Sequence, residues 1–246
     1  FPLMPRIYKA LAKGDCSPII DIMKMTPQIP ENCQWCTFLR NHDELTLEMV
    51  TEEDRQFLWN FYAPIPRMRQ NLGIRRRLAP LMDGNCQKVL LLNAILFSLP
   101  GTPIIYYGDE IGMGDNIYLE DRDGVRTPMQ WDSSRNAGFS SAVEEKMYLP
   151  VIKSEQFTYS RINVASQQQD PHSLFNTIRK MLAIRKQNPL MAGGAVEFIE
   201  NAQVPALLFL KRCDEKNILF ALHNLSEQAI PVDLRAHIRD GQPLLD

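Results

Sequence analysis

Four polar residues in a row, Asn41-His42-Asp43-Glu44, form the densest cluster of groups in the sequence that could take part in chemistry. A carboxylate beside an imidazole can hold two neighbouring hydroxyl groups of a sugar, because together they offer adjacent acceptors and donors. The alternative interpretation is a polar strand end, since Asn and Asp are common turn formers, and composition alone favours that alternative. His42, Asp43 and Glu44 are therefore candidate sugar-binding residues, and a purely structural role at a strand end stays open for them.

A second cluster is Arg126-Thr127-Pro128-Met129-Gln130-Trp131. A guanidinium can donate to hydroxyl groups, and the face of an indole can cover the C–H groups of a sugar. The alternative is a packed Trp131 beside a surface Arg126, and the spacing alone does not decide between the two. For Asp109-Glu110 we favour a structural role, in which polar residues at a strand end make a hydrogen bond.

Three further motifs predict no chemistry. Asp121-Arg122-Asp123-Gly124 is similar to the start of a calcium loop but lacks the Glu about twelve positions along, so we expect a turn. Arg75-Arg76-Arg77 is typical of a solvated face, although its place in a long loop is compatible with a lid. Cys33-Gln34-Trp35-Cys36 has no second ligand pair, so we expect all five cysteines to be ordinary buried or half-buried thiols in a reducing compartment.

Helical and strand patterns alternate in the elements that must position these residues. Apolar residues recur at helical spacing in four stretches, residues 7–13, 19–25, 51–61 and 87–99. Thr51 is followed by three acidic residues, which is typical of a helix start. Residues 35–39 and 103–107 are predicted strands, and the second is apolar enough throughout to be covered on both faces.

Both predicted strands end in acidic residues and are followed by long excursions. In a (β/α)8 barrel the loops after the carboxyl ends of the strands surround a common mouth, where long loops usually serve function. Two strands are fewer than the eight of a closed barrel, so we expect an α/β fold that is part of a barrel. Residues 111–169 are predicted to be irregular, and a helix is expected to begin at Asp170-Pro171 and to end at Asn188-Pro189.

The pattern changes character near residues 191–194. Four short strand-like stretches follow, at residues 195–199, 206–210, 218–223 and 229–234. Short strands separated by turn residues predict a small antiparallel unit. We therefore expect two domains, a barrel portion at residues 1–190 and the start of a small β domain at residues 191–246.

Length and composition exclude several classes of protein. The chain has 246 residues, with 27 Lys and Arg against 29 Asp and Glu, and a net charge of −2. This balance lacks the basic footprint of a dedicated nucleic-acid binder. No apolar run approaches the roughly 20 residues that span a bilayer. We expect a cytoplasmic protein that has neither nucleic acid nor membrane as a partner.

Several motifs resemble a known family of retaining glycoside enzymes, the α-amylase superfamily. Residues 38–43 resemble its seventh-strand region, residues 101–110 its eighth-strand signature, and residues 126–132 a stretch of its oligo-1,6-glucosidase branch. Within that branch, four motifs resemble the trehalose synthase family, which interconverts maltose and trehalose. These motifs lie at residues 1–6, 40–48, 73–80 and 112–118.

The resemblance implies strands seven and eight of a (β/α)8 TIM barrel with flanking helices, followed by a partial antiparallel β-sandwich. It implies that Asp43 is the carboxylate that stabilises an oxocarbenium-like transition state. His42, Glu44 and Arg126 would bind substrate. The implied partners are small α-glucosides, namely maltose, trehalose and glucose. No metal and no cofactor is implied for this chain, since the family's calcium site lies upstream.

The nucleophile Asp and the acid/base Glu of the family lie on the fourth and fifth strands, which match nothing in these 246 residues. The resemblance therefore predicts a fragment that is inactive alone. Exposed strands would favour self-association or pairing with a complementary barrel half. Two alternatives stay open, namely part of an oligo-1,6-glucosidase or α-amylase-type hydrolase, and a non-catalytic sugar-binding or assembly module.

Overall fold

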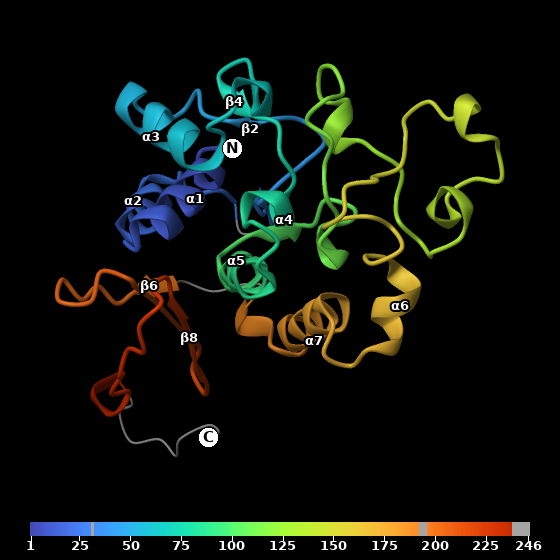
Figure 1. Cartoon of the computed structure of the whole chain (residues 1–246). Coiled ribbons are helices and arrows are strands. Elements are labelled where there is room, and N and C mark those ends of the chain that lie inside the picture. The colour runs from blue at the N-terminus through green and yellow to red at the C-terminus, as the bar shows by residue number, and fades with distance from the viewer. Residues whose placement is uncertain (31, 192–195, 238–246) are drawn as a thin grey trace.

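The computed structural model describes residues 1–30, 32–191 and 196–237 (Figure 1). The α-helices are α1 (Leu3–Lys13), α2 (Ser17–Met25), α3 (Glu52–Tyr62), α4 (Leu78–Leu81), α5 (Cys86–Ser98), α6 (Val164–Gln169) and α7 (Leu174–Gln187). The strands are β1 (Cys36–Phe38), β2 (Leu45–Thr46), β3 (Arg69–Gln70), β4 (Gly73–Ile74), β5 (Thr102–Ile104), β6 (Val196–Phe198), β7 (Leu207–Cys213) and β8 (Ile218–Asn224). Within the described ranges no helix is both long and apolar enough to cross a membrane.

Side-chain caps begin both α3 and α7, but only the start of α3 lies where the sequence predicts it. The Thr51 hydroxyl accepts a hydrogen bond from the backbone N–H of Asp54 at 3.2 Å, which caps α3 as expected. The expected start of α7 at Asp170-Pro171 is wrong. Residues 170–173 instead form a turn, in which the Ser173 amide donates to the Asp170 carbonyl, and the Ser173 hydroxyl caps the helix.

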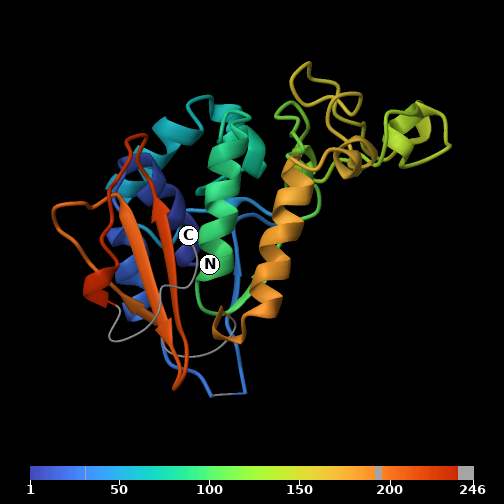
Figure 2. The same cartoon turned by 90° about the horizontal axis from the view of Figure 1, so that it is seen from below.

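Helix α5 is the centre of the core. Figure 2 shows α5 beside α7, with the C-terminal strands on the other side of α5. Its apolar residues face several neighbours at once, and Leu92 and Ile95 have no exposed surface. Complete burial of each such side chain stabilises the fold by roughly 1.5–3 kcal/mol. The apolar pattern of residues 87–99 is therefore confirmed as that of a helix buried on several sides.

Strands β1 and β5 form a parallel pair in which Phe38 lies opposite Ile104. Parallel neighbours need a crossover connection, and here residues 39–101 with α3, α4 and α5 supply it. The expected strand at residues 103–107, covered on both faces, is wrong in extent and in burial. The strand ends at Ile104, whose side chain is 46% exposed, and the hydroxyls of the next two tyrosines bond to the carbonyls of residues 125 and 127.

Strands β6, β7 and β8 form an antiparallel sheet in sequence order, with Leu210 of β7 opposite Ala221 of β8. The fourth predicted strand, residues 229–234, is not formed. The backbone there is irregular, and Pro231 has no N–H to donate to a ladder. The predicted domain boundary falls mostly on residues 192–195, which lie outside the described residues.

The last turn of α5 is held by side chains from α7 and from the C-terminal sheet. Carbonyls at the end of a helix have no donor within the helix. Arg185 of α7 donates to the carbonyl of Phe97, and Arg212 of β7 donates to the carbonyl of Ser98 at 2.8 Å. His223 of β8 places its Nε2 2.7 Å from the Ser98 hydroxyl oxygen. These contacts attach the sheet to the helical part.

The stretch between β5 and α6 is irregular, as predicted, apart from short 3-10 turns. Figure 1 shows it in green to yellow, extending to the side away from α1, α2 and α3. Within the region expected to be irregular, all of which the structure describes, residues 164–169 form the one α-helix, α6. This long excursion returns across the end of β1, where the polar cluster lies.

Candidate functional site

Residues 40–44 leave β1 as a turn that is held on both sides of Asp43. The side-chain oxygen of Asn41 accepts a hydrogen bond from the backbone N–H of Asp43 at 2.9 Å. The buried Arg40 donates to the carbonyl of Asp43 at 2.8 Å and to the carbonyl of Arg76 at 2.7 Å. The main chain of Asp43 is thus fixed, while its side chain is 43% exposed.

Arg122 joins the two carboxylates of the cluster. Its Nε lies 2.6 Å from Oδ1 of Asp43 and 2.9 Å from Oε2 of Glu44. Partial burial works to raise the pKa of Asp43, but hydrogen bonds with Glu44 and Arg122 and the charge of Arg122 outweigh it and lower that pKa. Asp43 is therefore ionised at neutral pH. The sequence predicts only a turn at Arg122 and gives no signal for this contact.

His42 and Arg126 lie next to this pair of carboxylates. Arg126 donates from Nε to the backbone carbonyl of His42 at 2.9 Å, and its Nη1 lies 3.8 Å from Oδ2 of Asp121. The His42 imidazole is exposed, and within the described residues it has no hydrogen-bond partner. The structure thus brings all four predicted residues, Glu44 included, to the end of β1.

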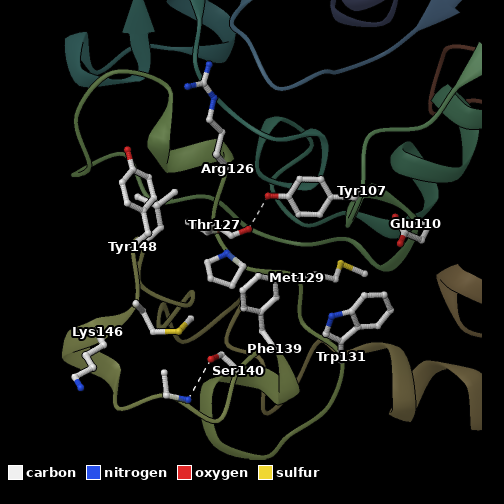
Figure 3. A pocket seen from close by; sticks show the side chains of 14 residues that line it. Tyr107, Glu110, Arg126, Thr127, Met129, Trp131, Phe139, Ser140, Lys146 and Tyr148 are labelled. Atoms are coloured by element: carbon white, nitrogen blue, oxygen red, sulfur yellow. Dashed lines mark hydrogen bonds between the residues drawn. The ribbon is translucent and has the colours of Figure 1, made fainter.

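A cavity of about 580 Å³ adjoins the cluster and shares Arg126 with it. Figure 3 shows Arg126 at one end and aromatic rings around the cavity. Tyr107 is fixed there, because its hydroxyl donates to the carbonyl of Thr127 at 2.6 Å. Trp131 also lines the cavity and is 50% exposed, so the indole is not the packed core residue of the alternative interpretation. An arginine and exposed aromatic faces suit a sugar ring.

The arginine run at residues 75–77 is not a solvated face, and that prediction is wrong. Arg75 is 8% exposed and Arg77 has no exposed surface. Arg77 lies 3.7 Å from Asp109 and is stacked on the rings of Tyr106 and Tyr107, 4.7 and 4.6 Å from their centroids. Burial raises the pKa of Asp109 to about 7, against the pull of Arg77. Asp109 thus has a structural ion-pair contact, but within the described part of the chain its Oδ1 makes no hydrogen bond of the kind expected for this residue.

Comparison with known proteins identifies relatives of this chain. The family model "Alpha amylase, catalytic domain" matches residues 75–194. A trehalose synthase from Pimelobacter sp. (strain R48) is 47% identical over 245 residues, covering 98% of this chain and 43% of that enzyme. The chain is homologous to trehalose synthases of the α-amylase family.

Other relatives of this trehalose synthase homologue are more distant. A probable α-glucosidase from Rhizobium meliloti is 36% identical to this chain. The alignment covers 78% of this chain and 37% of that protein. Among solved structures, the α-amylase from H. orenii aligns with a TM-score of 0.62 over 92% of this chain and 38% of that one, at 20% identity, which shows a shared fold. The homologue spans less than half the length of the trehalose synthases that it matches.

The cysteines and the possible metal-binding groups complete the description of the predicted residues. Cys16 is buried, but Cys33, Cys36, Cys86 and Cys213 are exposed, so the expectation of buried or half-buried thiols is wrong for these four. All five thiols are free. Among the described residues of the trehalose synthase homologue, no three His, Cys, Asp or Glu side chains lie close enough together to hold a metal ion.

Proposed function

We propose that this chain forms the α-glucoside-binding part of a trehalose synthase-like enzyme, which interconverts maltose and trehalose by retaining intramolecular transglucosylation. The observation that supports this most directly is the convergence of Asp43, Glu44 and Arg122 at the end of β1, 2.6 to 2.9 Å apart across the ion pairs. The homology to trehalose synthases favours this function over a hydrolase of the same family.

The proposed chemistry follows from the ionisation and exposure of these groups. An ionised Asp43 accepts hydrogen bonds from two hydroxyls of a glucosyl ring and stabilises positive charge that develops at the anomeric carbon. The exposed His42 imidazole supplies a neighbouring donor. Arg126 leads from this position into the adjoining cavity, where Trp131 offers a ring face to the second sugar.

In this proposal β1 and β5 are the seventh and eighth strands of a barrel, and the C-terminal sheet is part of a sandwich domain. The family's nucleophile and acid/base come from strands that these 246 residues do not match. The chain by itself is thus proposed to bind α-glucosides without turnover. We also propose that the exposed Trp35 and Ile104, beside β1 and in β5, promote self-association or pairing with a complementary barrel half.

Titration calorimetry with maltose tests the binding role. Asp43→Asn keeps the shape but removes the charge, and hydrogen bonds to a charged group contribute about 1.5–3 kcal/mol, so affinity should fall about tenfold or more. Glu48→Gln is the matched control, because Glu48 is an exposed carboxylate five residues further along. Equal affinities in native and Asp43→Asn chains would refute the proposed role of Asp43.

A maltose-to-trehalose assay on the purified chain tests the second part. We expect no trehalose, because removal of a nucleophile from a group of cooperating residues abolishes nearly all of the rate. Robust formation of trehalose by the 246 residues alone would overturn the proposal that the two missing carboxylates are needed. Release of free glucose without trehalose would overturn it as well, because a retaining hydrolase of the same family needs the same two carboxylates.

A further inference from the structure

Most hydrogen bonds of the Arg75 guanidinium go to backbone carbonyls of a loop that is distant in the sequence. Its Nη1 donates to the carbonyls of Leu119 and Asp121 at 2.8 and 2.5 Å, and its Nη2 donates to the carbonyl of Ile117 at 3.2 Å. The remaining Nε donates to the carbonyl of Arg67 at 2.7 Å. The side chain is thus buried with all of these donors directed at main-chain oxygens, three of them within residues 117–121.

This loop ends at Asp121, directly before Arg122, which contacts the carboxylate cluster. Asp121 has a φ of +45°, a left-handed conformation that a residue with a Cβ keeps only where its surroundings fix it. Its carbonyl is held by Arg75, and its carboxylate accepts a hydrogen bond from Nη1 of Arg122 at 2.7 Å. Arg122 then reaches Asp43 and Glu44.

We propose that Arg75 is a positioning residue, which holds the turn at Asp121 so that Arg122 lies against Asp43 and Glu44. The side chain contacts neither carboxylate, so it acts only through the loop. The proposal rests on the proposed function only in giving Asp43 its role as the sugar-binding carboxylate. The contacts themselves stand without it.

The neighbouring arginines do not share this task. Arg76 pairs through Nε with both carboxylate oxygens of Asp115, at 2.9 and 3.0 Å. Arg77 donates to the carbonyl of Tyr107 at 2.7 Å. Consecutive residues of one run therefore fix three different parts of the excursion after β5, and of these three arginines it is Arg75 that holds the part next to Arg122.

The test follows the ionisation of Asp43 by NMR, from carboxyl ¹³C shifts against pH in the whole chain. Arg122→Gln should raise the pKa of Asp43, because it removes the cation and a hydrogen-bond donor. Arg75→Met should raise that pKa toward the value found in Arg122→Gln. In the double variant Arg75→Met adds nothing further, because its effect passes through Arg122.

Arg185→Met is the matched control. Arg185 is 9% exposed and also donates to two backbone carbonyls, but these belong to Phe97 in the last turn of α5 and to Gly101 just after it. The Arg185→Met substitution should destabilise the chain comparably without moving the pKa of Asp43. If Arg75→Met does not fold, Arg75→Lys keeps the charge with fewer donors and should move the pKa in the same direction by a smaller amount.

Two results would overturn the proposal. One is an unchanged pKa of Asp43 in the Arg75 variants when Arg122→Gln raises it. The other is an effect of the Arg75 substitution that persists in full when Arg122 is already replaced. Neither depends on maltose binding, so a chain that binds no sugar but shows the expected pKa changes would reject the proposed function and keep the role of Arg75.

Discussion

Acidification is expected to destabilise the chain through His223. This imidazole is 7% exposed and lies against the last turn of α5. Burial lowers the pKa of His223 from 6.5 to about 4, because the charged ring would lose its water. The unfolded chain therefore takes up a proton near pH 6.5 that the folded chain does not accept until about pH 4. The resulting stability is present above pH 6.5 and is lost as the pH falls toward 4.

The size of the loss follows from the two pKa values. Each pH unit between them corresponds to about 1.4 kcal/mol, so complete protonation removes about 3 kcal/mol of the free energy of unfolding. This is a large share of the roughly 5–15 kcal/mol that stabilises a typical domain. A single buried ring thus accounts for a marked acid sensitivity.

Urea unfolding at several pH values between 7.5 and 4 measures the effect. His223→Gln removes the titrating ring, so its stability should fall by about 3 kcal/mol less than that of the native chain over this range. His172→Gln is the control, since His172 is exposed, and it should follow the native chain. Parallel losses in native and His223→Gln chains, within about 0.5 kcal/mol, would refute the reasoning.

Two further predictions concern backbone geometry and capping. Gly101→Ala should destabilise by clearly more than about 1 kcal/mol, because at its φ of +104° a Cβ would lie 2.4 Å from the Trp35 carbonyl oxygen. Gly14→Ala has open space and should cost only about 1 kcal/mol for its left-handed φ; equal losses in urea unfolding would contradict the steric argument. Thr51→Ala should cost about 1 kcal/mol in thermal unfolding, whereas Thr51→Ser, which keeps the hydroxyl, should stay near the native value; no difference between the two would reject the cap.

The parts of the structure that depend on near neighbours in the chain were predictable from the sequence. The Thr51 hydroxyl acts on an amide three residues away, and the side chain of Asn41 acts on an amide two residues away. The sequence does not locate the start of α7 even so, because Asp170 and Ser173 are both good caps. Only the turn between them decides which one is used.

Pairings between distant residues were not predictable in this way. Arg122 looked like a turn residue and is one, but Asp43 and Glu44 precede it by 79 and 78 residues. Arg75 looked like part of an exposed charge run, yet carbonyls 42 to 46 residues further along accept its hydrogen bonds. The pattern of charges in the sequence does not show whether such carbonyl oxygens lie close to an arginine in the fold. The residues around Arg75 in the sequence therefore do not predict that it is buried.

The end of α5 has a consequence for how the molecule can come apart. Phe97 and Ser98 offer carbonyl oxygens whose donors are Arg185 and Arg212, and these two arginines belong to different elements of the chain. Pulling the C-terminal strands away would carry Arg212 with them and would leave the Ser98 carbonyl without this donor. Because α7 and β7 both bind the last turn of α5, separation of either element weakens the contacts that the other makes there. We therefore expect the helices and the C-terminal sheet to unfold together.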